Sequence, residues 1–334
     1  MNAITDDVTD AATALESAAR RALHAPSVFN TQPWIWRITG NSMELRADPA
    51  RQLANTDPDR HLLLLSCGAA LQHARAALAA AGWQARVDRL PDPARPDLLA
   101  RIEIAGRIPV DPSAAAMASA IDRRRTDRRA FGMSPVPGTV LDGLRRAVEA
   151  EGAFLHVVRP DQIAMLAISE ELAEAAEIED PDYRIELEQW TSRTAEDADG
   201  VPPATAVKPG LRRVPTRDFV PDGNAGLEAG AGRDEGAAYV VVFGTGTTAK
   251  GLLRGGEAFS ALLLLATAEG LATAPLSDAV EVTWPRHLLR GLLAGVGEPF
   301  VVVRLGHSGG PELPPVPRRP ADQVIQIEHP GRKP

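Results

Sequence analysis

Apolar and polar residues alternate along the chain with two different periods, which together predict an α+β fold. Apolar residues at helical spacing predict helices at residues 10–24, 61–81, 113–125, 139–152 and 256–270, and a further helical region over 160–193. Short apolar runs predict strands at residues 34–39, 42–48, 84–90, 98–104, 153–158, 237–243 and 299–307. The Gly40-Asn41 turn between the first two strands is typical of a hairpin.

Regular periodicity is lost over residues 194–233, where Pro, Gly and Asp are abundant. A run of this length without regular structure is usually a functional lid or a disordered insertion when it occurs in a compact chain. We therefore expect a lid insertion at about residues 194–235.

Two Ala-rich stretches of equal length suggest an internal duplication. GAALQHARAALAAAG (68–82) and GEAFSALLLLATAEG (256–270) are both bounded by glycines, yet only four of their fifteen residues are identical. Chance similarity is the alternative to duplication. A duplication would divide the chain into two related domains, at residues 1–108 and 109–334.

The composition limits the classes of partner. The chain has 334 residues, 44% of them apolar, and a formal net charge of −8. The length suggests about two domains, and the negative charge argues against nucleic acid or an anionic membrane as the main partner. The single cysteine, Cys67, excludes an intramolecular disulfide and a Cys-based zinc site.

The chain carries no pattern that favours secretion or membrane insertion. Its acidic, polar beginning differs from a signal peptide, which starts basic and becomes apolar. Residues 61–83 are strongly apolar, but His73 and Arg75 interrupt them before they reach the length of a membrane span. We expect a buried helix there, no membrane partner and a cytoplasmic protein.

The stretch AIDRRRTDRRAF (120–131) places five arginines within seven positions of an acidic chain. A solvated helix end is the simplest interpretation. The alternative is an anion site, because arginine forks beside the hydroxyl of Thr126 suit a phosphate dianion.

The stretch APSVFNTQPW (25–34) fits neither a regular helix nor a strand. Pro26 ends the preceding helix, and Ser27, Asn30 and Gln32 then offer donors and acceptors from an irregular backbone. A capped turn between helix and strand would explain Ser27 and Asn30 but leaves Gln32 unexplained. Carboxamides also match the alternating donors and acceptors of a pyrimidine-like ring.

Other possible motifs carry less weight. FGTGTTAK (243–250) has the spacing of a dinucleotide-binding loop, but Gly251, Gly255 and Gly256 are expected to interrupt the helix that such a loop requires. His61, Cys67 and His73 lie six residues apart, which favours a structural role over metal binding. Paired carboxylates cannot be identified among 44 acidic residues, so the sequence predicts no metal site.

With these motifs in view, the sequence resembles the nitroreductase-like flavoproteins. That family combines an R-R-S-x-R-x-F motif for the phosphate of FMN, A-P-S-x-x-N-x-Q-P-W beside the flavin ring, an Ala-rich helix ending G-L-G-x-x-P, and an R-K-P turn. Here RRTDRRAF (124–131) follows the ring motif instead of preceding it, and AEGLATAPLSD (268–278) and PRRPADQVI (317–325) come later. This order, with the lid and the duplication, is similar to the twin-domain Acg subfamily.

The resemblance implies a nitroreductase-like fold in which two tandem related domains form an intramolecular pseudo-dimer. Each domain would have a central, mostly antiparallel sheet flanked by helices, and the chain would be a monomer with one FMN. For the phosphate and ribityl end the resemblance implies Arg124, Arg125, Thr126, Arg128 and Arg318. For the flavin ring it implies Pro26, Ser27, Asn30, Gln32, Pro275, Leu276 and Ser277.

Two functions follow from the resemblance. The first is an FMN-dependent oxidoreductase that passes electrons from NAD(P)H to a nitroaromatic or quinone-like acceptor. The flavin would carry the redox chemistry, so no catalytic side chain is predicted. The second is a protein that stores or sequesters FMN with little turnover, because the insertion, with Arg212, Arg213 and Arg217, could cover the cleft.

Overall fold

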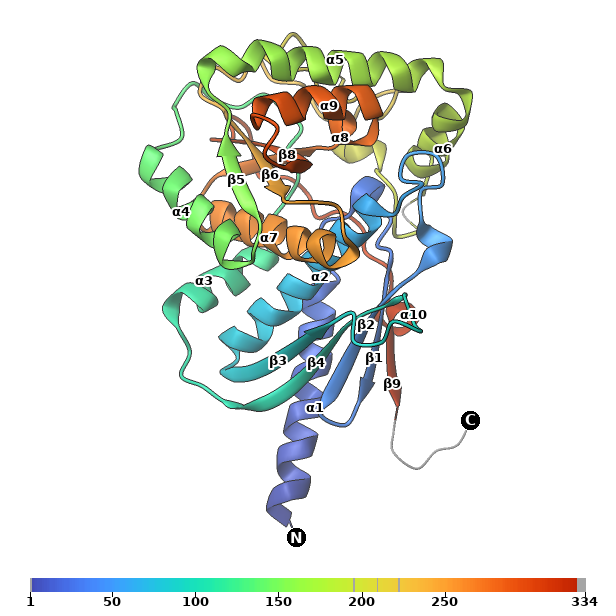
Figure 1. The fold of residues 1–334 in the computed structure, drawn as a ribbon, viewed down its shortest axis with the longest axis vertical. Helices are drawn as coiled ribbons and strands as arrows, with labels where there is room; N and C mark the ends of the chain where they lie inside the picture. Colours follow the sequence, from blue (N-terminus) through green and yellow to red (C-terminus); the bar gives the residue numbers. More distant parts are fainter. Residues whose placement is uncertain (1, 195, 209, 222, 329–334) are drawn as a thin grey trace.

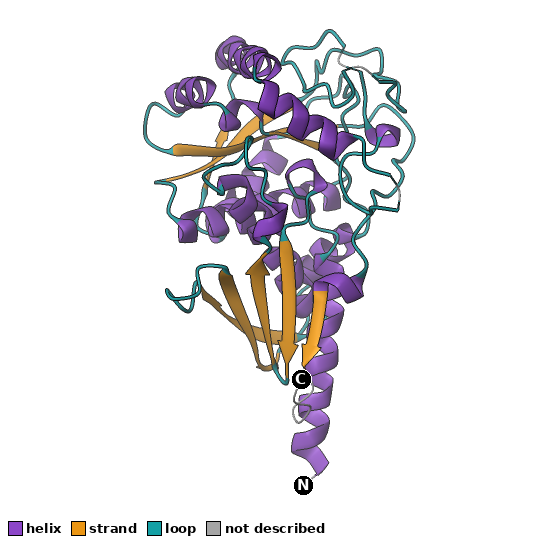
Figure 2. Cartoon of the chain, turned by 90° about the vertical axis from the view of Figure 1, so that its right-hand side faces the viewer, coloured by secondary structure: helices purple, strands orange, loops and turns teal. Residues whose placement is uncertain are grey.

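Two β-sheets lie on either side of a central layer of helices (Figure 1). The structure is a computed structural model that describes residues 2–194, 196–208, 210–221 and 223–328. The view in Figure 2, turned by 90°, shows the same layers, with loops gathered along one side of the half that carries the second sheet.

Helices and strands cover most of the described chain. The helices are α1 Asn2–Ala22, α2 His61–Ala80, α3 Pro112–Ile121, α4 Gly138–Ala150, α5 Ile163–Glu179, α6 Pro181–Thr191, α7 Ala249–Ala268, α8 Asp278–Glu281, α9 Thr283–Leu292 and α10 Ala321–Val324. The strands are β1 Trp34–Thr39, β2 Ser42–Ala47, β3 Trp83–Arg89, β4 Leu98–Arg107, β5 Phe154–Val157, β6 Ala238–Gly244, β7 Ala272–Leu276, β8 Glu298–Gly306 and β9 Ile325–Glu328.

The first sheet has the strand order β3-β4-β2-β1-β9. Strands β1 to β4 pair antiparallel, and β9 joins the edge of β1 in parallel. Alternate residues of β1, Trp34, Trp36 and Ile38, are buried, as expected for a strand with one face on the core. Because β9 pairs with β1, residues 307–328, named here the C-terminal arm, return to the first sheet. The guanidinium of Arg318 donates to the carbonyl of His24, just after α1, at 3.3 Å.

The second sheet has the order β5-β6-β8-β7 and is antiparallel throughout. This order repeats β1-β2-β4-β3 strand for strand. The connections differ, since β1 and β2 are joined by the Gly40-Asn41 turn, whereas β5 and β6 are joined by residues 158–237, which carry α5, α6 and the irregular segment. The expectation of two mostly antiparallel sheets flanked by helices is confirmed.

The long helices α2 and α7 pack against each other between the sheets. A Cβ atom on Gly68 would lie 2.1 Å from the carbonyl oxygen of Leu253, and a Cβ atom on Gly256 would lie 2.1 Å from that of Leu65. The contacts are reciprocal, as in an interface between two related units. Both helices are apolar and long enough to cross a membrane by length and composition, but 89% and 72% of their apolar windows are buried within the protein.

Charged residues also join the two halves across this layer. Glu257 of α7 is fully buried and accepts hydrogen bonds from Arg75 of α2, at 2.7 Å, and Arg89 of β3, at 2.6 Å. The Nδ1 atom of His73 lies 2.9 Å from the hydroxyl of Ser260 in the other half. Within the first half, the thiol of Cys67 donates to the carbonyl of Pro33 at 3.2 Å. These buried contacts agree with the structural role predicted for His73 and Cys67.

One sequence expectation about this layer is wrong. Gly251, Gly255 and Gly256 do not interrupt a helix, because α7 begins at Ala249 and contains all three. Thr248 caps the helix by accepting the N–H of Gly251 at 3.1 Å. A Cβ on Gly255 would lie 2.5 Å from the ring of Phe300, so close packing explains the glycine. Strand β7, helix α9 and strand β9 were not predicted individually.

Candidate functional site

The turn that follows α1 has a strained backbone. Phe29, Asn30 and Gln32 have φ angles of 47°, 55° and 50°, in the left-handed region, which costs a residue other than glycine about 1–2 kcal/mol. The hydroxyl of Ser27 holds the turn by accepting the N–H of Gln32 at 2.9 Å. Strain of this kind persists where the surroundings fix it, and it is concentrated at functional sites.

The arginine run follows α3 and reaches the same place from the second half of the chain. Arg124 is 4% exposed, and its Nη2 donates to the carbonyl of His24 at 3.4 Å. Its Nε and Nη1 atoms are buried without a hydrogen-bond partner among the described residues, as are Nε of Arg125 and Nε of Arg318. Burial, followed by the charges of Arg318 and Arg125, lowers the pKa of Arg124 to about 9. Several guanidinium donors are therefore left for an anion.

A fully buried ion pair orders the loop after these arginines. Arg304 of β8 donates to Asp234 at 2.6 Å and to the carbonyl oxygens of Asp127 and Arg129, both at 2.9 Å. Asp234 in turn accepts the N–H of Phe131 at 2.7 Å. Because a buried charge is costly without a partner, this network fixes the course of the loop.

Two adjoining cavities, of about 100 and 60 Å³, lie where the turn and the arginine run meet. Both are lined by Pro26, Ser27, Phe29, Thr126 and Arg128. We call them together the cleft. The larger cavity is mainly apolar, and the smaller one has Arg124 and Arg318 in its wall. The cleft therefore has an apolar end and a cationic end.

Most of the predicted site residues line this cleft. Nine of the twelve do so: Pro26, Ser27, Asn30, Arg124, Thr126, Arg128, Pro275, Ser277 and Arg318. Three line neither cavity: Arg125, Gln32 and Leu276. Arg125 donates to the carbonyl oxygens of Asp122 and Arg124, and Leu276 is buried in β7.

The Gln32 side chain binds other parts of the chain through both its nitrogen and its oxygen. Its Nε2 donates to the carbonyl of Ala198 at 2.9 Å, and its Oε1 accepts the N–H of Arg319 at 2.9 Å. Asn30 is placed similarly, since its Nδ2 donates to Gly200 at 3.0 Å and its Oδ1 accepts from Arg318 at 3.1 Å. The two amides thus tie the turn to residues 198–200 and to the C-terminal arm.

Sequence reasoning missed the apolar wall of the cleft. It is formed by Val28, Phe29, Leu62, Leu65, Phe219, Phe259 and Val301. In the sequence, Leu62, Leu65 and Phe259 look like any other core positions of the two apolar helices. Phe29 could have been suspected, because it lies within the stretch APSVFNTQPW.

Residues 194–235, named here the cover segment, contribute to both cavities. Phe219 packs edge-on against Phe29 with ring centroids 5.9 Å apart, and the guanidinium of Arg128 lies 4.4 Å from the centre of the Phe219 ring. At the other cavity, Gly200, Val201, Pro202 and Thr205 form part of the wall. The cover segment therefore closes one side of the cleft.

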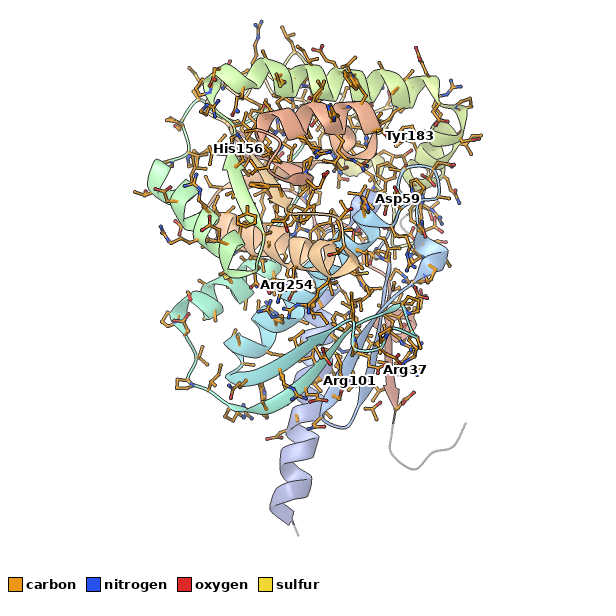
Figure 3. The ribbon with its side chains drawn as sticks, in the orientation of Figure 1. Arg37, Asp59, Arg101, His156, Tyr183 and Arg254 are labelled. Atoms are coloured by element: carbon orange, nitrogen blue, oxygen red, sulfur yellow. The ribbon has the colours of Figure 1, made fainter. Side chains whose placement is uncertain are left out.

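Two arginines, Arg51 and Arg217, anchor the cover segment. Arg51, beside β2, pairs with Asp199 and donates to the carbonyl of Thr31. Arg217 points into the protein and pairs with Glu177 of α5, at 3.0 Å, and with Asp278 and Glu281 of α8. Its guanidinium also lies 5.7 Å from the ring centre of Tyr183, which Figure 3 labels where α6 approaches α8.

Burial changes the titration of the carboxylates around Arg217. It raises the pKa of Glu177 to about 9 and that of Asp278 to about 6, while the charge of Arg217 acts in the opposite direction on both. The carboxyl of Glu170, in the same region, has a pKa well above its usual value for the same reason. Burial thus changes these pKa values more than the charge of the single Arg217 guanidinium does.

The chain matches no protein-family model. Two proteins of Mycobacterium tuberculosis are similar to it along nearly their whole length. "Putative NAD(P)H nitroreductase Rv3131" is 38% identical over 314 residues, which cover 91% of this chain and 89% of that protein. "Putative NAD(P)H nitroreductase acg" is 36% identical over 317 residues, covering 94% and 95%.

Among solved structures, the FMN-dependent nitroreductase NfnB from Mycobacterium smegmatis, in complex with NADPH, matches 65% of this chain and 100% of its own. Its sequence identity is 17% and its TM-score is 0.43, so this match supports no conclusion about ligands. The two sequence relatives do decide the family, because more than a third of the residues are identical over nine-tenths of the chain. The chain belongs to the family of nitroreductase-like proteins that includes Acg of Mycobacterium tuberculosis.

Proposed function

We propose that the cleft binds one FMN and that the protein is an FMN-dependent oxidoreductase of the nitroreductase type. The observation that carries the proposal is a set of buried guanidinium donors that have no hydrogen-bond partner within the described part of the chain, Arg124 Nε and Nη1 and Arg318 Nε. They lie at the cationic end of a cleft whose other end is apolar. Charge-assisted hydrogen bonds from arginine are well suited to a phosphate dianion. The names of the relatives agree with this class of reaction.

In this proposal each part of the cleft has a separate task. Arg124 and Arg318 would hold the phosphate, with the hydroxyl of Thr126 beside them. Ser27, Pro275 and Ser277 would lie along the flavin ring, and the surrounding apolar residues would exclude water. Bound FMN would supply the redox chemistry, accepting a hydride from NAD(P)H and passing electrons to a nitro- or quinone-like acceptor. No side chain is assigned a catalytic role.

The division of the site between the two halves supports a pseudo-dimer. The matching strand orders and the reciprocal Gly68 and Gly256 contacts support two related domains, 1–108 and 109–334, in one chain. We propose that the chain is a monomer that takes the place of a dimer and builds one site. Light scattering of the purified protein should then give a mass of about 35.5 kDa.

The second candidate is FMN storage, and the cover segment favours it. Phe219 lines the apolar cavity, as do Pro275 and Ser277, so it occupies part of the wall where a second substrate would need access to the flavin. If the segment acts as a lid that stays closed, FMN would be held with little turnover. If it opens, the same segment would admit the substrate.

One experiment separates these candidates. The purified protein is loaded with FMN, freed of excess flavin, and titrated anaerobically with NADH and NADPH while its absorption spectrum is recorded. Rapid bleaching, reversed by a quinone or nitroaromatic, is expected for the oxidoreductase. A yellow protein that neither nucleotide bleaches indicates storage. A protein that retains no FMN overturns both.

A further inference from the structure

Helix α5 has an unusual distribution of side chains. Its acidic residues Glu170 and Glu177, seven positions apart and therefore on one face, are buried at 1% and 5% exposure. Its apolar residues Met165 and Ile168 are instead 43% and 49% exposed. Burying carboxylates in this way is costly unless they meet a positive charge. The buried face of α5 therefore favours a positive charge or a bound proton beside these carboxylates.

Helix α8 adds two carboxylates to the same place. Asp278 and Glu281 join Glu177, and one oxygen from each of the three lies within 4.8 Å of the others. The Nη2 atom of Arg217 lies between them, 3.0 Å from Glu177 and 2.6 Å from Glu281, in contact with Asp278. Oxygens around Ca²⁺, at about 2.3–2.6 Å from the ion, have a comparable mutual spacing. Arg217 thus occupies the position that a divalent cation would take.

Arg217 does not satisfy the cluster completely. Both oxygens of Glu170 and Oε1 of Glu281 are buried without a hydrogen-bond donor among the described residues. Glu170 lies on the buried face of α5 that also carries Glu177, and α5 packs against α8, which places Glu170 near the same cluster. The Arg217 guanidinium contacts three of these four carboxylates, Glu177, Asp278 and Glu281. Unpaired oxygen ligands remain available for a hard cation.

We propose that Glu177, Asp278 and Glu281, with Glu170 beside them, form a site for a divalent cation with oxygen ligands, and that this cation and Arg217 compete for the site. The cation and the guanidinium need the same three carboxylates, and two positive charges in one buried cluster repel each other, so each weakens binding of the other. Arg217 is two residues from Phe219, which lines the cleft. Binding of the cation therefore favours the state in which the cover segment has left the cleft, and an open segment favours the cation.

Mn²⁺ is a suitable probe because free and bound ion differ in their electron paramagnetic resonance signals. We expect Arg217→Gln to bind one Mn²⁺ at least 10-fold more tightly than the wild type does. Arg212→Gln, in the same segment, is the matched control and should behave as the wild type. Adding Glu177→Gln and Asp278→Asn to Arg217→Gln should abolish binding. A folded Arg217→Gln variant that binds no Mn²⁺, or binding that survives loss of both carboxylates, would overturn the proposal.

A second measurement uses the wild type and does not depend on whether Arg217→Gln folds. Millimolar Mn²⁺ should accelerate tryptic cleavage at Arg212 and Arg213 several-fold, because the cover segment is released. The acceleration should be absent in Glu177→Gln. A cleavage rate unchanged by Mn²⁺ in the wild type would contradict the competition. Neither readout uses FMN, so failure here is distinct from failure of the proposed function; only the effect on access to the flavin rests on that function.

Discussion

The two halves of the molecule share one strand order but differ in how their first two strands are connected. In the first half a tight turn at Gly40-Asn41 joins β1 to β2. In the second half, residues 158–237 join β5 to β6 and carry α5, α6 and the cover segment. The first half contributes the strained turn, and the second contributes the arginines and the cover. If the proposed function holds, the comparison teaches that two halves with one strand order can contribute unequally to a single site.

The largest expected effect comes from removing the cationic end of the cleft. Arg124→Ala combined with Arg318→Ala removes two charge-assisted contacts of about 1.5–3 kcal/mol each, so FMN affinity should fall by about 10²- to 10⁴-fold. Flavin fluorescence during titration measures the change. Arg123→Ala is the matched control, because Arg123 belongs to the same run but is exposed. Equal FMN affinity in the double variant and the control would contradict the proposal that Arg124 and Arg318 bind the phosphate of FMN.

A second test concerns the contact between the halves. Gly68→Ala and Gly256→Ala each bring a Cβ to 2.1 Å from a backbone oxygen of the other helix, so each should lower the free energy of unfolding by about 3 kcal/mol. Urea denaturation measures the free energy of unfolding of each variant. Gly143→Ala in α4, whose nearest atom would be 3.9 Å away, should instead stabilise by about 0.5–1 kcal/mol. Markedly unequal losses at positions 68 and 256 would argue against a symmetric relation.

The carboxylate cluster lies in the second half and gives that half its own pH dependence. Burial raises the pKa of Asp278 from 3.8 to about 6, so the folded state binds this proton more tightly than the unfolded state. The stability that this proton contributes is fully present below about pH 4 and is lost as the pH rises through 6. Relative to Asp278→Asn, the wild type should lose on the order of 2–3 kcal/mol over that range. Urea denaturation at several pH values tests this, and a constant difference between the two proteins would contradict it.

The smallest effect is expected at Gln32, whose amide either anchors the cover segment or contacts the flavin directly. If its amide only anchors the cover segment, Gln32→Ala costs about 1 kcal/mol and raises the rate of proteolysis in that segment by up to about 10-fold. The affinity for FMN should then change less than about 3-fold. A large loss of FMN affinity with unchanged proteolysis would instead support direct contact with the flavin.

Much of the fold could be predicted because periodicity reports local structure. The limits of α2 and most strands follow from runs of apolar residues, and the irregularity of residues 194–233 was recognised from Pro and Gly. The start of α7 at Ala249 is not predicted, because glycines usually weaken a helix. Here Gly255 and Gly256 instead allow close packing against Phe300 and α2. Contacts that depend on packing between distant elements leave little trace in a local pattern.

The candidate site shows the same difference between local patterns, which the sequence reveals, and contacts between distant residues, which it does not. The motifs located nine residues that line the cleft, since donors in an irregular stretch are visible in the sequence. Arg217 and its carboxylate partners were not recognised as a cluster, because Glu177 and Asp278 lie a hundred positions apart and look like ordinary acidic residues. Gln32 was noticed, but its partners on the cover segment and the C-terminal arm become clear only in three dimensions.

The central claim is that a turn from the first half and arginines from the second enclose one flavin. A crystal structure of the protein loaded with FMN tests it most directly. We expect one FMN per chain, with its phosphate within hydrogen-bonding distance of Arg124 and Arg318 and its ring between Ser27 and Pro275. An FMN bound elsewhere, for example in the 320 Å³ cavity between residues 50–55 and α6, would contradict the account.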